Sequence, residues 1–252
     1  MKLRVSIVTL SALFIAACSG SAANGSDAAE GGGTPAAPVA TAAAPKGKSW
    51  VDTVRATPEG GFVMGNPNAP LKLIEFGSRL CPFCGEFDRT GLPQLKAKYI
   101  ATGKVSYEFR DYPIHGAPDL APILLGHCTD DPATFFPILD QMMQAQADIL
   151  PREEAAIRKV QALGNPSPTQ IATAYAEGLG LIDFMKQRGL PEAKARACLT
   201  SQARIDTIAQ RTKAANDKYQ VQSTPTFILN GEVLSSIDTW QKLEALLKQR
   251  GA

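Results

Sequence analysis

Cys81-Pro82-Phe83-Cys84 decides the fold of this chain, because it stands where a strand pattern gives way to a helical pattern. The strand pattern is the largely apolar run at residues 71–76, LKLIEF. A C-x-x-C motif at such a junction is typical of a redox-active dithiol. Unpaired N–H groups and the dipole at a helix N-terminus favour an anion, so this position lowers the pKa of the Cys81 thiol. Pro82 fits the first helical turn, which needs no N–H from it.

Three other interpretations of the cysteine pair are weaker. A structural zinc site draws four ligands from two close pairs, and the other candidate ligands lie at no paired spacing. These candidates are Cys128, Cys198, His115 and His127. Haem attachment requires His directly after the second cysteine, where Gly85 stands. An inert structural disulfide is the simplest alternative, since short cysteine pairs in exported proteins are often only staples. We therefore expect a redox pair and no metal.

The N-terminus indicates export. Two basic residues precede an uncharged segment at residues 5–17, which is too short to span a bilayer and is typical of a signal peptide. Its end at residues 15–18, IAAC, resembles a bacterial lipobox. This resemblance implies removal of residues 1–17 and lipidation of Cys18, which would anchor the protein to a membrane from the periplasmic side. Ordinary cleavage nearby and secretion as a soluble protein is the alternative.

Residues 18–49 follow as an expected disordered linker, because they are nearly all Ala, Gly, Pro, Ser and Thr. The remaining chain, roughly 200 residues, suffices for one sizeable core. The formal charge of +2 falls to zero when the two basic residues of the signal peptide are removed. No basic cluster remains, so we expect no nucleic-acid partner.

The cysteine count fits an oxidising compartment. The chain has five cysteines. If Cys18 carries lipid and the C-x-x-C pair cycles, Cys128 and Cys198 remain as one structural disulfide between helical segments. Two buried free thiols are the alternative.

The order of predicted elements defines an α/β fold. Residues 105–110 alternate in polarity as a half-buried strand does, and Asn230-Gly231 between two apolar runs predicts a hairpin. Between them lie helical patterns that predict four or five helices, at residues 134–150, 152–163, 169–188 and 201–219. The sequence therefore predicts a thioredoxin fold (βαβ–ββα) with an inserted helical domain. The thioredoxin-fold domain comprises residues 50–114 and 220–252, and the helical insertion comprises residues 115–219.

From about residue 60 onward, the chain resembles the DsbA-like branch of the thioredoxin superfamily. The matching segments are GNPNAP at 65–70, the C-x-x-C motif, residues 103–113 and STPTF at 223–227. The resemblance implies a thiol:disulfide oxidoreductase in which Cys81 is the exposed nucleophile and Cys84 the buried resolving thiol. It implies cysteine-containing exported proteins as substrates and a membrane redox partner of the DsbB or DsbD type. The Cys81–Cys84 disulfide would be the redox group, with no further cofactor.

The same resemblance suggests a peptide-binding site beside the dithiol. Relatives have a cis bond where Thr224-Pro225 stands, which frees the Thr224 backbone to pair with an extended substrate. Pro82 and Phe83 would complete this surface. A trans turn proline is the alternative.

Glu75 lies six residues before Cys81, in a strand that should be central. Burial would raise its carboxyl pKa and suit proton exchange with Cys84. A surface-facing Glu at an edge is the alternative. For His115 and His127 we expect solvated or helix-capping roles.

The direction of electron flow is the open question. The best-known oxidases carry His where Phe83 stands, and that imidazole helps to stabilise the thiolate. We therefore expect a higher Cys81 pKa and a milder oxidant here. An oxidase that donates disulfides is the leading hypothesis. A disulfide reductase or isomerase, or a non-catalytic lipid-tethered peptide-binding module or chaperone, is the alternative.

Overall fold

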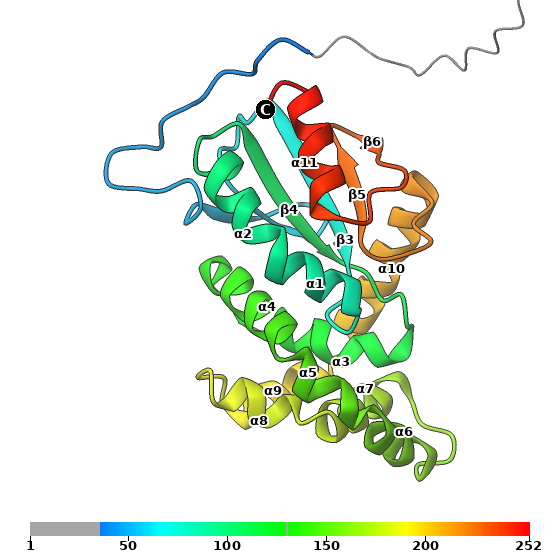
Figure 1. The fold of residues 1–252 in the computed structure, drawn as a ribbon. Coiled ribbons are helices and arrows are strands. Elements are labelled where there is room, and N and C mark those ends of the chain that lie inside the picture. Colours follow the sequence, from blue (N-terminus) through cyan, green and yellow to red (C-terminus); the bar gives the residue numbers. More distant parts are fainter. Residues whose placement is uncertain (1–35, 130) are drawn as a thin grey trace, which may run out of the picture. The chain divides into compact units, whose positions relative to one another are not determined.

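A computed structural model describes residues 36–129 and 131–252. In this part of the chain, six strands form one mixed sheet in the order β1-β2-β4-β3-β5-β6 (Figure 1). Only β3 and β4 are parallel, and the other neighbours are antiparallel. The strands are β1 (Val54–Ala56), β2 (Phe62–Met64), β3 (Leu71–Gly77), β4 (Val105–Asp111), β5 (Thr226–Leu229) and β6 (Glu232–Val233). The predicted thioredoxin-type α/β fold is confirmed.

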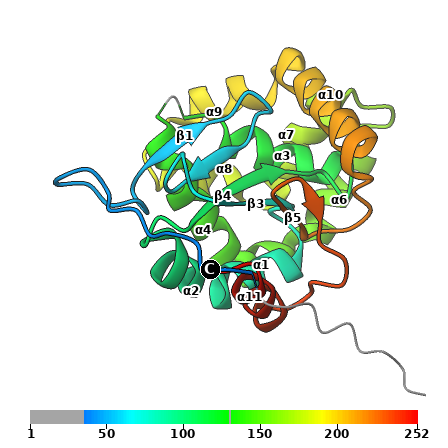
Figure 2. The same cartoon turned by 90° about the horizontal axis from the view of Figure 1, so that it is seen from above.

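Helices cover both faces of this sheet (Figure 2). One face carries α1 (Pro82–Thr90), α2 (Leu92–Leu95), a π-helical turn (Lys96–Ile100) and α11 (Trp240–Gln249). Their apolar side chains share one core with β3, β4 and β5. The other face carries α10 (Gln202–Tyr219), whose Ala215 and Tyr219 pack on Phe76 and Ile228. The central strand β3 is therefore enclosed on both sides.

The chain between β4 and β5 is helical, where the sequence predicts the insertion. Besides α10 it contains α3 (Ala117–Gly126), α4 (Phe135–Gln144), α5 (Gln146–Ile149), α6 (Glu153–Gln161), α7 (Pro168–Gly178), α8 (Leu181–Lys186) and α9 (Glu192–Leu199). These eight helices, counted over the described residues, exceed the four or five expected. The pattern at 169–188 is split because Gly180 adopts a left-handed conformation with φ 75°. The helices enclose a second apolar core of their own.

The segment before the first strand differs from the expected linker. The disordered linker predicted for 18–49 is wrong for its described part, because residues from Ala36 onward bind the folded domain. The Ala36 N–H donates to the Gln249 carbonyl at 2.9 Å, and the Trp50 indole N–H donates to the Ala42 carbonyl at 2.6 Å. Backbone hydrogen bonds do not depend on apolar composition, so composition alone could not reveal this contact.

The predicted signal peptide at 1–17 and Cys18 lie outside the described residues. Within the described residues, no helix has the length and apolar character needed to cross a bilayer.

Candidate active site

The dithiol lies at the junction of β3 and α1. Cys81 is the N-cap of α1, and Pro82 occupies the first helical turn. Cys84 lies inside that turn, and both thiols are free and buried. Phe83 between them is 72% exposed and is one of the exposed large apolar side chains of the described chain. The motif therefore combines an aromatic ring exposed to solvent with two buried sulfur atoms.

The Cys81 thiol is strongly acidified. A hydrogen bond with Cys84 is the largest cause, and Thr224 and the N–H groups of Cys84 and Phe83 add to it. Partial burial opposes the effect, and the resulting pKa is about 5. Corresponding cysteines have values of about 7 in thioredoxin and about 3.5 in DsbA. The value here lies between them, as expected for a motif that has Phe83 in place of His.

Cys84 behaves in the opposite way. Burial raises its pKa well above the usual value, and the hydrogen bond to Cys81 and the charge of Glu75 raise it further. Above about pH 5 the reduced pair therefore consists of a Cys81 thiolate beside a Cys84 thiol. Only the thiolate is nucleophilic, so the structure separates an attacking sulfur from a resolving one.

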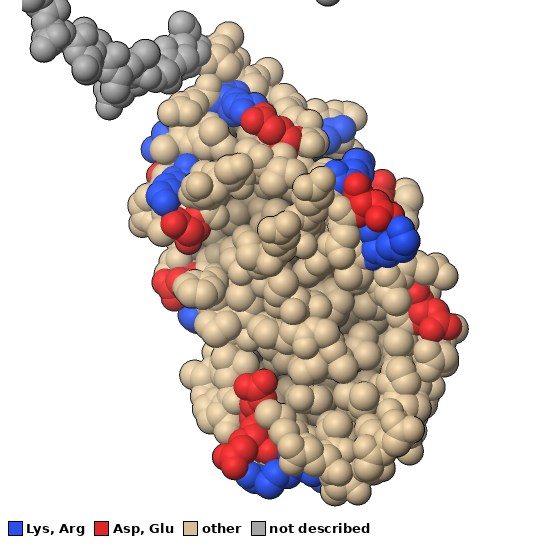
Figure 3. All heavy atoms as spheres, turned by 90° about the vertical axis from the view of Figure 1, so that its right-hand side faces the viewer, with Lys and Arg blue, Asp and Glu red and all other residues tan. Residues whose placement is uncertain are grey.

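The segment facing Cys81 comes from the start of β5. The Thr224–Pro225 bond is cis, and the Cys81 thiol donates to the Thr224 carbonyl at 3.3 Å. The first turn of α1 lies on the right-hand side of Figure 1, and Figure 3 shows that side of the molecule. The middle of this side is a broad area without charged residues, and charged groups lie around its edges (Figure 3).

Glu75 lies in the middle of β3 and is only 1% exposed, so the predicted burial is confirmed and the surface alternative is wrong. The Tyr107 hydroxyl donates to its carboxylate at 2.6 Å. Burial is the main cause that raises the Glu75 pKa to about 8; the Tyr107 hydrogen bond opposes this, and the charges of Asp88 and Cys81 add to it. A carboxyl with this pKa is protonated at neutral pH and can donate a proton.

Two further acidic residues, one on α1 and one on α4, contact each other. Asp88, on the buried side of α1, contacts Asp140 of α4, and burial followed by the Asp140 charge raises the Asp88 pKa to about 8. Lys96 binds one Asp140 oxygen at 2.6 Å. The other Asp140 oxygen has no hydrogen-bond partner in the described part of the chain. Sequence reasoning missed these residues, because the contact joins two helices that lie about fifty positions apart.

Two further groups position the segment that carries Cys81. Arg79 is fully buried and forms two hydrogen bonds with the Asp111 carboxylate, at 2.7 and 3.0 Å. His127 contacts the same carboxylate at 2.8 Å. Burial opposes ionisation of Asp111, but the Arg79 charge and the His127 hydrogen bond lower its pKa to about 2. His127, directly after α3, is part of this network. His115, which precedes α3, contacts Asp119 of that helix.

Gln146 of α5 reaches the dithiol from the helical region. Its amide nitrogen donates to the carbonyls of Cys81 at 2.9 Å and Arg79 at 3.1 Å. A Cβ atom at Gly85 would stand 2.0 Å from the Gln146 side-chain oxygen. The glycine after the second cysteine therefore leaves room for Gln146.

Comparison with known proteins assigns the family. The family model described as thioredoxin matches residues 57–249. The chain belongs to the thioredoxin family. A solved thioredoxin-like structure, described as a protein-disulfide isomerase from Novosphingobium aromaticivorans, is 29% identical with a TM-score of 0.67. The match covers 73% of this chain and 94% of that one.

More distant likenesses extend this result. Wolbachia pipientis α-DsbA1 shares the fold, with a TM-score of 0.60, 20% identity, and coverage of 78% of this chain and 93% of that one. Disulfide bond formation protein D of Bacillus subtilis is 23% identical over 193 residues, which are 76% of this chain and 77% of that protein. A Rickettsia felis protein, named provisionally as a protein-disulfide oxidoreductase, is 26% identical over 170 residues. That match covers 68% of this chain and 53% of the relative, so the chain spans about half of that protein's length.

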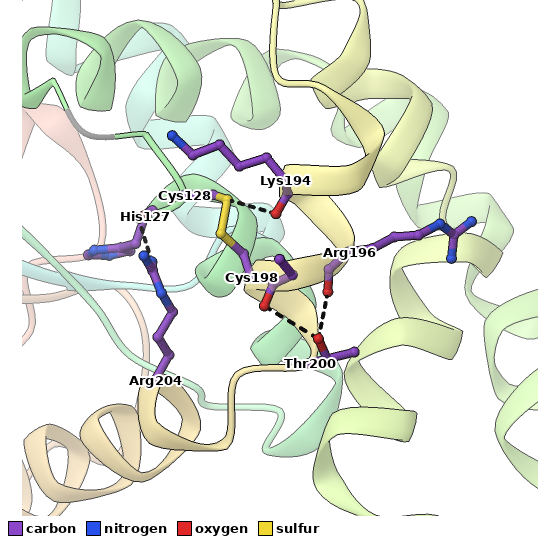
Figure 4. The surroundings of a disulfide bond; sticks show 8 residues. His127, Cys128, Lys194, Arg196, Cys198, Thr200 and Arg204 are labelled. Carbon is purple, nitrogen blue, oxygen red and sulfur yellow. Dashed lines mark hydrogen bonds between the residues drawn. A yellow bond between two sulfur atoms is a disulfide. The ribbon is translucent and has the colours of Figure 1, made fainter.

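In this member of the thioredoxin family, the other two described cysteines are bonded. Cys128, just after α3, forms a disulfide with Cys198 of α9, with a Cα–Cα distance of 6.0 Å (Figure 4). The Lys194 carbonyl oxygen lies 3.5 Å from the Cys128 sulfur. The alternative of two free thiols is wrong. The disulfide belongs to the core of the helical region, whereas the dithiol belongs to the core beside the sheet.

The described residues contain no group of three or more His, Cys, Asp and Glu side chains that could hold a metal ion. The site consists of the dithiol, the cis-proline segment and the buried acid beneath them.

Proposed function

We propose that this chain is a thiol–disulfide oxidoreductase that donates its Cys81–Cys84 disulfide to cysteine pairs of exported proteins. The opposite pKa shifts of the two thiols carry this proposal. They give each sulfur a separate role in thiol–disulfide exchange, which a structural staple or a simple binding surface would not require.

The reaction transfers two electrons from substrate to enzyme. A substrate thiolate attacks the Cys81 sulfur, the Cys81–Cys84 bond breaks, and a mixed disulfide forms. Cys84 leaves as a thiolate and takes a proton, for which the Glu75 carboxyl is the buried donor. A second substrate thiolate then attacks the substrate sulfur of the mixed disulfide. Cys81 leaves as a stable thiolate, the substrate is oxidised, and the enzyme is reduced.

The acidity of Cys81 supports the oxidase direction. A stabilised thiolate favours the reduced enzyme, so the oxidised enzyme is a good disulfide donor. Because the Cys81 pKa of about 5 is intermediate, we place the potential between about −120 and −270 mV, nearer the oxidising end.

Substrate capture would use the surface around the dithiol. The exposed Phe83 ring offers apolar contact, and Pro82 shapes the same turn. The backbone beside the cis Pro225 would pair with an extended substrate segment, with Thr224 next to the attacked sulfur.

The cellular setting follows from the N-terminal sequence. We place the protein in the periplasm, attached to a membrane through lipidated Cys18, with no cofactor besides the redox disulfide. A membrane partner of the DsbB type would reoxidise the dithiol. Labelled palmitate should enter the wild type and not Cys18→Ala, and a mature N-terminus beyond residue 18 would contradict the anchor.

The deciding experiment is the redox state of Cys81–Cys84, trapped by acid and alkylated directly from cells. An oxidase is held mainly oxidised. A mainly reduced pair would favour the isomerase, the function in the description of the Novosphingobium relative, supplied with electrons by a DsbD-type partner. Acceleration of insulin reduction by dithiothreitol separates either enzyme from a non-catalytic peptide-binding module or chaperone, which would not accelerate it.

A further inference from the structure

A cavity of about 500 Å³ lies on the face of the sheet opposite α1 and the dithiol. It is bounded by α10, α3, the end of β4 and the turn between β1 and β2. Its apolar lining comes mainly from Phe76, Ile123, Leu124, Ile208 and Tyr219. The volume lies within the range of about 300–1,000 Å³ that is usual for small-molecule sites. Nothing in the proposed exchange reaction uses this cavity.

One side of the cavity is lined with cations from a single helix. Arg204, Arg211 and Lys218 follow one another at intervals of seven residues along α10 and all line the cavity. Seven residues are almost two helical turns, so the three cations lie on one side of the helix, about 10 Å apart along its axis.

These cations lack acidic partners among the described residues. Arg211 has no ion pair and no hydrogen bond there, and its guanidinium lies over the β1–β2 turn, where a Cβ at Gly60 would stand 2.0 Å from its Cζ atom. Lys218 has no ion pair among the described residues, and its ammonium lies 4.9 Å from the centroid of the Tyr219 ring. Arg204 donates to the His127 carbonyl at 2.8 Å (Figure 4), which leaves its charge uncompensated.

The acids that line the cavity do not neutralise this side. Asp111 is already bound by Arg79 and His127. Glu59 lies 3.8 Å from Arg110, another cation of the lining, and forms no ion pair with Arg211. The cavity therefore combines an apolar interior with a net positive rim.

We propose that this cavity binds a single-chain amphiphile with an anionic head, such as a fatty acid or a lysophospholipid. The apolar chain would fill the space between α10, α3 and the sheet, and the head would lie at Arg211 and Lys218. A peptide fits less well, because β4 is paired on both sides with β2 and β3 and offers no free edge for a peptide backbone.

The test is calorimetric titration of the purified full-length protein with dodecanoate below its micellar concentration. We expect saturable one-site binding, weakened about tenfold or more by Arg211→Gln, because a charged hydrogen bond contributes about 1.5–3 kcal/mol. Lys218→Gln should also weaken it. Lys213→Gln is the matched control, since Lys213 lies on the same helix, pairs with Asp217 and does not line the cavity. It should leave the affinity unchanged.

Two further ligands complete the test. Dodecyltrimethylammonium has the same chain and the opposite charge, and it should not bind. Lysophosphatidylglycerol distinguishes the sources: tighter binding than dodecanoate indicates a lipid headgroup, and weaker binding indicates a free fatty acid. Dithiol exchange by Arg211→Gln should equal that of the wild type, which shows that the variant is folded. Absence of dodecanoate binding, equal affinity in Arg211→Gln and Lys213→Gln, or equal binding of the cationic ligand would each overturn the proposal.

Discussion

The two cysteine pairs of the described chain differ in what surrounds the sulfur atoms. Cys81 and Cys84 lie within one helical turn, where N–H groups from the start of α1 face the first sulfur and lower its pKa. Cys128 and Cys198 are 70 residues apart and join two helices. A carbonyl oxygen, not a donor, lies beside the Cys128 sulfur. The Thr224 carbonyl also lies beside Cys81, so the difference lies in the hydrogen bonds that Cys81 has with Cys84 and with the N–H groups of α1, which stabilise its thiolate. One pair is therefore suited to exchange and the other to cross-linking.

Replacing the cysteines of the dithiol should have the largest effect. Cys81→Ser should abolish exchange, because it removes the only acidified thiol of the pair. Cys84→Ser should instead accumulate mixed disulfides, because the resolving sulfur is missing. Non-reducing gels of cell extracts, probed for the protein, distinguish the two variants. Equal trapping by both variants would contradict the separation of roles.

Replacing Glu75 by Gln should slow exchange by about 100-fold, the lower end of the range for losing a general acid. Gln fills the same space and can still accept from Tyr107, but it cannot give a proton to Cys84. The wild-type rate should fall as the pH rises through about 8, where Glu75 ionises, and the variant should lack this step. Stopped-flow oxidation of a model dithiol peptide between pH 5 and 9 measures both. If the Glu75→Gln variant shows the same fall in rate near pH 8, another group donates the proton to Cys84.

The free energy of unfolding should also depend on pH, because burial raises the pKa of the Glu75 carboxyl in the folded state. The folded-state pKa of Glu75 is raised from 4.5 to about 8, so its contribution is fully present below about pH 4.5 and is lost as the pH rises through 8. The loss is on the order of 5 kcal/mol. Relative to the wild type, Glu75→Gln should therefore gain stability between pH 5 and pH 9 in urea unfolding.

Replacing the Cys128–Cys198 disulfide should lower the stability of the fold and leave the rate of thiol–disulfide exchange unchanged. Cys128→Ala with Cys198→Ala should lower the free energy of unfolding by about 2–5 kcal/mol, since the bond closes a long loop. Exchange at 25 °C should stay near the wild-type rate, because these sulfur atoms belong to a different core. Thermal unfolding and insulin reduction, measured on the same samples, test the two statements. A loss of exchange in a folded double variant would show that the pairs are coupled.

The sequence predicted the dithiol and the order of the elements from β3 onward, because each depends on a local pattern, but it did not predict the short strands β1 and β2. The hairpin around Asn230-Gly231 is such a case, and Leu229 pairs with Glu232 as expected. The burial of Glu75 also followed, since a strand preceding the motif had to be central. Contacts between distant segments were not predictable: the Asp88–Asp140 pair requires α1 and α4 to meet. The contacts of residues 36–49 include backbone hydrogen bonds, which every residue except proline can donate and which a sequence pattern therefore does not reveal.

Gln146 of α5 joins the helical region to the backbone of the dithiol segment, and its replacement should have the smallest effect of these changes. Gln146→Leu removes the Gln146 donor from the Arg79 and Cys81 carbonyls, although the Cys81 carbonyl still accepts from the Gly85 N–H at 3.1 Å, and the loss should cost about 1–3 kcal/mol of stability. Exchange should slow by less than about tenfold, because misplacement of the Cys81 sulfur by a full ångström would cost about 100-fold and α1 still holds Cys81. Gln144→Leu is the matched control, since that side chain is exposed on α4, and it should change neither quantity. Rates are measured at 25 °C, where both variants are folded. A rate loss as large as that of Glu75→Gln would mean that the helical region positions Cys81 for reaction; an unchanged rate would mean that it only supports the fold.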